Sequence, residues 1–184
     1  MPGNIWITAD THFGHGSIIR HCSRPFQDAS EMDEALQANW NAVVRPGDLV
    51  YHLGDFCYSK SGKHAADYLK PLNGRIILVS GSHDRQTDLE AFDEHASYME
   101  IAVNGTRLCL CHYAMRVWHG SHHGSVHAYG HTHGRLPPLG RSMDVGVDTN
   151  NFWPYPLEEV VQRLLALEIS TAGLNTMESD FAQD

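Results

Sequence analysis

The chain places aspartate and histidine side chains directly after several apolar segments, at short and regular spacings. Asp10 and His12 follow the segment NIWITA, and Asp55 follows Gly54 after the segment VYHL. The full series of polar residues at such ends is Asp10, His12, Asp55, Ser82, His83, Asp84, His112, His131 and His133. Any one of these groups is more often a solvated strand edge or a turn than a functional site. Their repetition after five apolar segments indicates a shared site, because one fold brings such ends to the same rim.

The residue types at these ends indicate metal chemistry. Neutral imidazole and carboxylate groups are the ligands expected for Mn, Fe, Co, Ni or Zn. Outside the segment SHD, the series supplies six such groups, which is too many for one closed tetrahedral zinc site. They suit a two-metal site in which one carboxylate bridges ions ~3.5–4 Å apart. Asp10 and His12 stand two residues apart, so in an extended chain both side chains point to the same side.

Composition supports native histidine chemistry in an acidic protein. The chain has 14 histidines against 13 lysines and arginines together, and no run of histidines at either terminus suggests a purification tag. Its formal net charge is −9, which argues against stable nucleic-acid binding, although bound cations would reverse the field locally.

Four cysteines in 184 residues are too few and too scattered for a disulfide framework. Cys109 and Cys111 share one face of a strand-like segment, where packing is favoured over metal binding. The N-terminal segment shows no basic region and no apolar stretch long enough for export or membrane insertion. We therefore expect a cytoplasmic protein with no membrane partner, and the sequence leaves its oligomeric state open.

Strands and helices alternate along the chain, which predicts an α/β domain. Strands are expected over residues 4–9, 48–53, 75–80, 96–103, 106–112, 126–129 and 143–147. The two strands around Asn104-Gly105 should form a hairpin, and the apolar strand 75–80 should be buried on both faces.

Helices are expected over residues 28–44 and 62–72 and from Pro156 onward. In the first of them, Asp28 can cap the N-terminus and Glu31 can complete a capping box. No repeat, linker or charge block marks a second domain. We therefore expect one domain over residues 1–168, followed by a polar acidic tail over residues 169–184.

In five ordered motifs the chain resembles the calcineurin-like metallophosphoesterase family. They read Asp10-Thr11-His12, Gly54-Asp55, Gly81-Ser82-His83-Asp84, His112 and Gly130-His131-Thr132-His133. The resemblance covers roughly residues 5–165, and the segments THFGH, RPF, EMDEALQANWN and VYHLGDF are similar to a compact bacterial and phage branch. It implies two packed mixed β-sheets flanked by helices, in four α/β/β/α layers, with metals at the strand ends.

The resemblance also implies a role for each residue. It assigns the first metal to Asp10, His12 and His133, a bridging position to Asp55, and the second metal to His112 and His131. Of the two divalent ions, manganese is favoured, and Fe, Zn, Ni or Co are alternatives. His83 would face the scissile phosphate as a catalytic residue, and Asp84 would orient it through a ring N–H.

Ser82 departs from the family, which has an asparagine ligand of the second metal at this position. A serine hydroxyl is a shorter arm and a poorer donor, so we expect it to bind through water or not at all and to lower second-metal affinity. Either the natural protein has a weaker second site, or the serine was introduced to slow turnover.

Candidates for substrate binding are His15, Arg20 and Arg24, since arginine binds phosphate bidentately, although surface arginines are usually only solvated. The segment 118–127 adds four histidines. It is either a loop over the substrate or a plain polar loop.

The expected function is that of a dinuclear metal-dependent phosphodiesterase. It would hydrolyse small or cyclic phosphoesters, with 2′,3′-cyclic nucleotides as candidates, by in-line attack of a metal-bridging hydroxide. Its partner would then be a small phosphoester or nucleotide. Two alternatives remain: a phosphomonoesterase or protein phosphatase of the same fold, and a degenerate family member that acts as a protein-binding scaffold.

Overall fold

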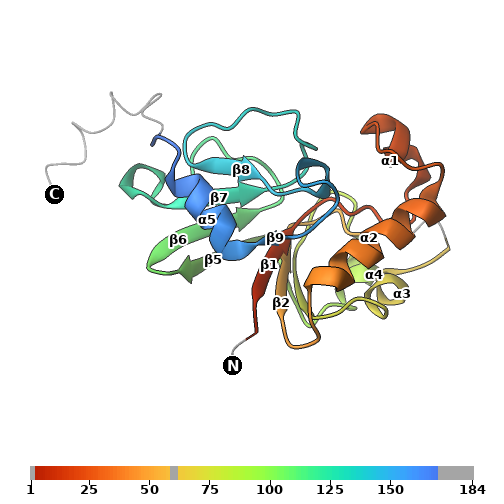
Figure 1. The fold of residues 1–184 in the computed structure, drawn as a ribbon. Helices are drawn as coiled ribbons and strands as arrows, with labels where there is room; N and C mark the ends of the chain where they lie inside the picture. Colours follow the sequence, from red (N-terminus) through yellow and green to blue (C-terminus); the bar gives the residue numbers. More distant parts are fainter. Residues whose placement is uncertain (1–2, 59–61, 170–184) are drawn as a thin grey trace, which may run out of the picture.

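A computed structural model describes residues 3–58 and 62–169 of the chain. Two mixed β-sheets pack together with helices (Figure 1), which confirms the expected α/β class. Nearly all of the expected tail, residues 170–184, lies outside the described residues. No helix within the described ranges is long and apolar enough to cross a lipid bilayer.

The first sheet has the strand order β4-β3-β2-β1-β9. Its strands are β1 (Ile5–Thr8), β2 (Leu49–His52), β3 (Arg75–Val79), β4 (Glu94–Ala96) and β9 (Tyr155–Pro156). The first four run parallel, and β9 pairs antiparallel with β1. In β3, Ile76 and Leu78 enter one hydrophobic core while Ile77 and Val79 enter the other. This confirms the prediction that the apolar run is buried on both faces.

The second sheet has the strand order β5-β6-β7-β8. Its strands are β5 (Tyr98–Val103), β6 (Thr106–Cys111), β7 (Val126–Tyr129) and β8 (Ser142–Asp144). β5 and β6 form the predicted antiparallel hairpin, while β6, β7 and β8 run parallel. Asn104 and Gly105 have φ of 49° and 83°, the left-handed conformations that a two-residue hairpin turn with the right twist requires.

The helices divide between the two cores. They are α1 (Gly16–His21), α2 (Ala29–Val43), α3 (Ala65–Leu69), α4 (Gln86–Leu89) and α5 (Leu157–Leu165). Trp40 of α2 belongs to the core on one face of the first sheet, to which α1, α3 and α4 also contribute. Val160 and Leu164 of α5 join the other core, which lies between the two sheets. Burial of these apolar side chains fixes the two sheets relative to each other.

The start of α2 differs in one detail from the prediction. Asp28 is the N-cap, and its carboxylate accepts a hydrogen bond from the Glu31 backbone N–H at 3.0 Å, as predicted. The Glu31 carboxylate accepts from the backbone N–H of Gln27 at 2.6 Å rather than from that of Asp28, so the capping box is not completed.

Several element boundaries also differ from the prediction. The predicted strand 96–103 is divided between the sheets, since Ala96 ends β4 and Tyr98 begins β5. The predicted strand 143–147 ends at Asp144, and a 3₁₀ turn follows over Val147–Thr149. The short helices α1 and α4 were not predicted, because six and four residues are too few to show a helical period.

Candidate metal centre

The carboxyl ends of parallel strands from both sheets meet at one edge. The backbone N–H of Asp10 donates to the carbonyl of Gly54 at 3.0 Å, which joins the segments that follow β1 and β2. Ala9 and Gly146 form a parallel bridge, which joins the segment after β1 to the segment after β8 in the other sheet. The two sheets are thus connected at the place where the predicted ligands follow their strands.

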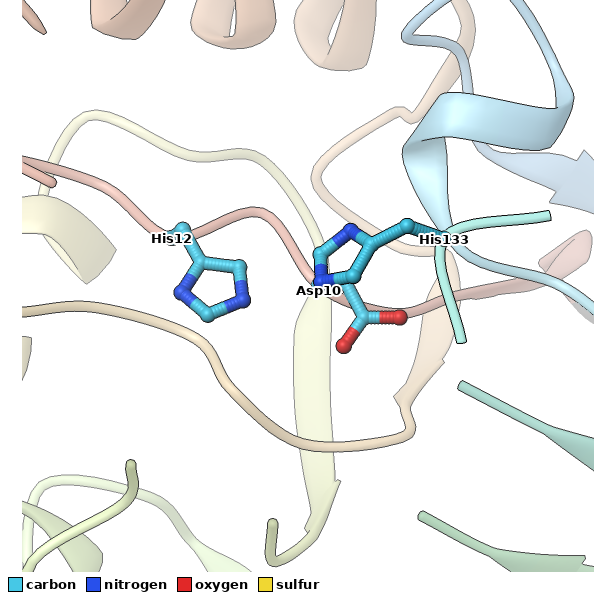
Figure 2. Close-up of side chains that lie close together, drawn as sticks. All are labelled: Asp10, His12 and His133. Carbon is cyan, nitrogen blue, oxygen red and sulfur yellow. The ribbon is translucent and has the colours of Figure 1, made fainter. Parts of the chain in front are cut away.

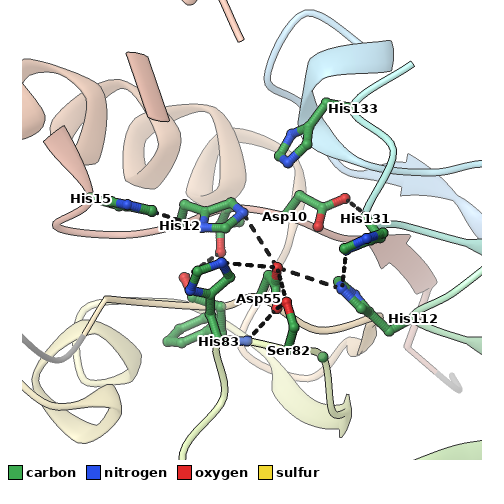
Figure 3. A network of polar contacts seen from close by, with 12 residues as sticks. Asp10, His12, His15, Asp55, Ser82, His83, His112, His131 and His133 are labelled. Atoms are coloured by element: carbon green, nitrogen blue, oxygen red, sulfur yellow. Dashed lines mark hydrogen bonds and ion pairs between the residues drawn. The ribbon is translucent and has the colours of Figure 1, made fainter. Parts of the chain in front are cut away.

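Two groups of three side chains at this edge have the composition and spacing of metal ligands. In each group the candidate ligand atoms all lie within 4.8 Å of one another. The first group is Asp10, His12 and His133 (Figure 2). The second group is Asp55, His112 and His131 (Figure 3).

The Asp55 carboxylate of the second group also faces the first group. Its Oδ2 atom is 3.6 Å from Nε2 of His12 in the first group and 3.5 Å from Nε2 of His112 in its own group. Figure 3 shows these contacts converging on one side chain. This is the position that a ligand shared between two cations requires.

Backbone and carboxylate oxygens fix the orientation of two histidine rings. His133 donates from Nδ1 to Oδ2 of Asp148 at 2.7 Å. His112 donates from Nδ1 to the carbonyl of Leu53 at 2.8 Å. Because the Nδ1 atoms carry the protons, both rings present Nε2 as a lone-pair donor, the arrangement common among metal-binding histidines.

Two buried polar atoms of the first group have no hydrogen-bond partner among the described residues. They are Oδ1 of Asp10 and Nε2 of His12. A buried polar atom without a partner is costly, and such atoms are rare in folded proteins. A divalent cation bound by both atoms would remove this cost, so the donor set fits a metal.

Buried negative charge dominates the electrostatics of this edge. Burial, followed by the carboxylates of Asp144 and Asp55, raises the pKa of Asp10 well above its usual value. Burial also acts to raise the pKa of Asp55, but the nearby imidazole of His112, together with the backbone N–H of His83, outweighs burial and lowers that pKa. Burial lowers the pKa of His12, which keeps the imidazole neutral and able to bind a metal. The edge therefore favours additional positive charge.

Five of the predicted ligands have left-handed backbone conformations. Their φ values are 57° for Asp10, 52° for His12, 54° for Asp55, 68° for His131 and 50° for His133. Such conformations cost on the order of 1–3 kcal/mol each and persist where the surrounding structure enforces them. The prediction that Asp10 and His12 lie on one side of an extended chain gives the wrong reason for their proximity, since both residues have left-handed rather than extended backbone conformations.

His83 and Ser82 lie beside Asp55 on the open side of the centre. The His83 side chain is 42% exposed, and its Nε2 is 3.9 Å from Oδ2 of Asp55. With His12 and Asp55 it forms a further group with ligand spacing, so its position suits either a catalytic role or metal binding. The Ser82 hydroxyl donates to the two carboxylate oxygens of Asp55, at 3.3 and 3.2 Å. Ser82 therefore contacts Asp55 and belongs to neither group of three.

Asp84 holds the backbone rather than the His83 ring. Its carboxylate accepts hydrogen bonds from the backbone N–H groups of Asp55 at 2.8 Å, Phe56 at 2.9 Å and Gly81 at 2.7 Å. This corrects the expectation that Asp84 orients His83 through a ring N–H, because the carboxylate faces the segment that follows β2. Asp84 instead fixes the position of Asp55.

Arg24 is buried and all of its donors are occupied, which corrects its expected role in substrate binding. Its guanidinium donates to both oxygens of Asp148 at 2.8 Å and to the carbonyls of Asp10 and Thr11. The remaining N–H contacts Sδ of Met32 at 3.3 Å. Arg24 therefore supports the first group of ligands from behind and has no donor left for a substrate phosphate.

A cavity of about 630 Å³ opens beside the centre. His15 lines it as expected; its Nδ1 lies 3.1 Å from Nδ1 of His12, and its ring stacks on Tyr58 at 4.2 Å. Arg20 is exposed and is not among the described residues that line this cavity. Of the predicted substrate-binding residues, the structure therefore brings only His15 to the cavity.

The segment 118–127 lies away from this cavity, since no described residue of it belongs to the lining. His119 pairs with Glu100 of β5 at 2.9 Å, and His127 donates from Nδ1 to the carbonyl of Cys109 at 3.0 Å. These contacts hold the segment against β5 and β6, and its last two residues, Val126 and His127, belong to β7. Cys109 is buried in this packing, as expected.

The sequence prediction missed two carboxylates, Asp148 and Asp144. Asp148 orients His133, as described above. Asp144 accepts hydrogen bonds from the hydroxyl of Thr132 at 2.5 Å and the N–H of Gly134 at 2.9 Å, which fixes the loop that carries His133. The signal that would have found Asp148 is the one that found Asp55: an acidic residue after an apolar strand and a glycine, here Gly146.

Comparisons with known proteins agree with this geometry. The family model described as calcineurin-like phosphoesterase matches residues 3–128, a range that includes Asp10, Asp55 and His112 and ends before His131. An uncharacterized protein of Methanocaldococcus jannaschii is 35% identical over 168 residues, which cover 86% of this chain and 89% of that protein. The gene 66 protein of Mycobacterium phage L5 is 35% identical over 85 residues, or 44% of this chain and 40% of that protein.

Among solved structures, a protein of unknown function from Aquifex aeolicus has a similar fold. Its TM-score is 0.69 and its sequence identity 25%, and the match covers 88% of this chain and 99% of that one. The likeness extends over nearly the whole of the shorter protein, so both sheets and the edge between them belong to a shared architecture.

The role of Asp84 can be tested by Asp84→Asn. The amide replaces one acceptor oxygen by a donor that faces backbone N–H groups, so we expect the free energy of unfolding of the metal-free chain to fall by about 1–3 kcal/mol. Urea denaturation measures this. The control Asp93→Asn, at a side chain that is 74% exposed, should change it by less than about 0.5 kcal/mol. If Asp84→Asn leaves the stability unchanged and lowers kcat, Asp84 would instead act by orienting the His83 ring.

Proposed function

Because the chain belongs to the calcineurin-like phosphoesterase family, we propose that it is a dinuclear metal-dependent phosphodiesterase acting on small or cyclic phosphoesters. Candidate substrates are 2′,3′-cyclic nucleotides. The observation that carries the proposal is the position of the Asp55 carboxylate, 3.6 Å from His12 and 3.5 Å from His112, between two groups of three ligands. A single closed site would leave one of these groups without a metal.

Each side chain has a defined task in this proposal. Two divalent cations, with Mn²⁺ favoured, would activate water and neutralise charge on the phosphate oxygens when bound. They would be held by Asp10, His12 and His133, by the shared Asp55, and by His112 and His131. His83 is exposed to the cavity and can donate a proton to the leaving oxygen. Tyr58 and His15 line the cavity where the rest of the substrate would lie.

The size of the cavity suits a small-molecule substrate. Its volume of about 630 Å³ lies within the roughly 300–1,000 Å³ typical of small-molecule sites. A phosphate held by metal ions at Asp55 would have this cavity, which His83 lines, beside it for its ester substituents.

The function can be tested with a pair of chromogenic substrates. The chain stripped of metal by a chelator should hydrolyse bis-p-nitrophenyl phosphate at the background rate and regain activity when Mn²⁺ is added. The kcat/KM for this diester should exceed that for p-nitrophenyl phosphate, and elemental analysis should find two metal ions per chain. The reverse substrate preference would make the protein a phosphomonoesterase. Hydrolysis of neither substrate with Mn²⁺, Fe²⁺, Co²⁺, Ni²⁺ or Zn²⁺ would contradict an enzymatic role.

The position of His83 suits either a proton donor or a metal ligand, and a substitution distinguishes the two roles. As a proton donor it should contribute ~10²–10⁴-fold to kcat, so His83→Gln should lower kcat by that factor and leave metal content unchanged. His95→Gln, at an exposed histidine of β4, is the matched control and should keep both. Loss of a metal ion from His83→Gln would show that His83 is a ligand.

Ser82 sets the affinity for the second metal in this proposal. Ser82→Asn adds an amide oxygen that can reach a cation beside Asp55, so the weaker of the two dissociation constants for Mn²⁺ should fall by roughly 10-fold. Isothermal titration with Mn²⁺ measures both constants. Ser82→Ala should resemble the parent chain, since the hydroxyl contacts Asp55 rather than completing a ligand group. Tighter binding by the parent chain than by Ser82→Ala would show that the hydroxyl is itself a ligand.

A further inference from the structure

The cavity beside the metal centre is basic, in contrast to the chain as a whole. The chain carries 22 acidic residues and a formal net charge of −9. Among the described residues that line the cavity there is no aspartate or glutamate, whereas Arg85, Arg135 and His21 all belong to the lining. A concave surface lined by one sign of charge concentrates ligands of the opposite sign. The cavity therefore favours an anionic group in addition to the phosphate at the centre.

The two arginines are held close to the catalytic side chains by the sequence itself. Arg85 comes two residues after His83 and stands at the N-cap position of α4, and Arg135 comes two residues after His133. Both are exposed, and Arg135 donates to the carbonyl of His21 at the rim of the cavity. Each arginine therefore reaches the same cavity from a different loop.

The charges of these arginines are not neutralised within the part of the chain that the structure describes. Arg24, Arg75 and Arg107 form ion pairs with carboxylates, whereas neither Arg85 nor Arg135 lies within 4.0 Å of one among the described residues. A guanidinium group is a permanent positive charge in proteins. Both arginines are therefore available to pair with an anion of the ligand.

We propose, resting on the phosphodiesterase function above, that the substrate carries a second phosphate group, which Arg85 and Arg135 bind while the scissile phosphate lies at Asp55. A guanidinium fork binds phosphate bidentately, and a terminal phosphate offers three oxygens in different directions. Two guanidinium groups from different loops can therefore bind one terminal phosphate together. A carboxylate has only two oxygens, and a single guanidinium group occupies both of them. A 2′,3′-cyclic nucleotide with a 5′-phosphate has this chemistry.

The test compares adenosine 2′,3′-cyclic phosphate with its 5′-phosphorylated form. In the parent enzyme loaded with Mn²⁺, the 5′-phosphate should raise kcat/KM at least about tenfold, mainly through KM. Arg85→Gln and Arg135→Gln should each lower this ratio several-fold, and Arg85→Lys should retain part of it. Arg45→Gln is the matched control. Arg45 is exposed and precedes β2, whereas the metal centre lies at the other end of that strand, where Asp55 follows it. Thermal melting of each variant excludes misfolding.

The outcomes separate this inference from the function on which it rests. A ratio near one in the parent enzyme, with bis-p-nitrophenyl phosphate still hydrolysed, overturns the second phosphate and leaves the phosphodiesterase function in place. Should no phosphodiester be hydrolysed, calorimetric binding of adenosine 3′,5′-bisphosphate and adenosine 3′-phosphate decides the matter. The inference is supported if the parent chain binds the bisphosphate more tightly than the monophosphate and both arginine variants lose this difference. Equal binding of the two ligands by the parent chain overturns it.

Discussion

Two buried carboxylates at the junction of the sheets set the constraint on which the rest of the structure depends. Asp10 and Asp55 are almost fully buried, and Asp144 and Asp148 lie close by. Negative charges in such surroundings repel one another and lack the hydration that water provides. Hydrogen bonds from backbone N–H groups and contacts with His112 offset part of this cost, yet Oδ1 of Asp10 has no partner among the described residues. A cation bound there would offset the remainder, so the same feature that costs free energy in the metal-free chain would give this edge its affinity for metal.

The backbone around these carboxylates explains why glycines stand beside the ligands. Gly54 has φ of 86°, and a Cβ there would lie 2.5 Å from the backbone nitrogen of Gly81 and 2.8 Å from Nδ1 of His112. A Cβ on Gly130 would lie 2.8 Å from Oδ2 of Asp10. The strand ends approach one another too closely for any side chain at these positions. Strained ligand conformations persist here because the cores on both sides of the first sheet fix the strands from which they emerge.

Burial divides the basic residues near the centre into two kinds. Arg24 is inside, where its charge balances Asp148 and its remaining donors hold the segment after β1. Arg85 and Arg135 are outside, where their charges face a cavity free of described carboxylates. An acidic chain can therefore present a cavity whose described lining carries positive and no negative side chains, since the carboxylates nearest the cavity, such as Asp10 and Asp55, are buried behind it.

The sequence by itself determined the α/β class, the hairpin at Asn104-Gly105 and the candidate ligands. These follow from local patterns: apolar runs that end in a glycine and a metal-binding side chain, and a turn whose residues tolerate left-handed conformations. Only the tertiary structure decided that Arg24 is internal, that Asp84 supports Asp55, and that Asp148 orients His133. Arg24 and Asp148 are 124 positions apart, and Asp55 and Asp84 are 29 apart. No local pattern records such pairs, because the packing of the two sheets joins Arg24 to Asp148, and the pairing of β2 with β3 joins Asp55 to Asp84.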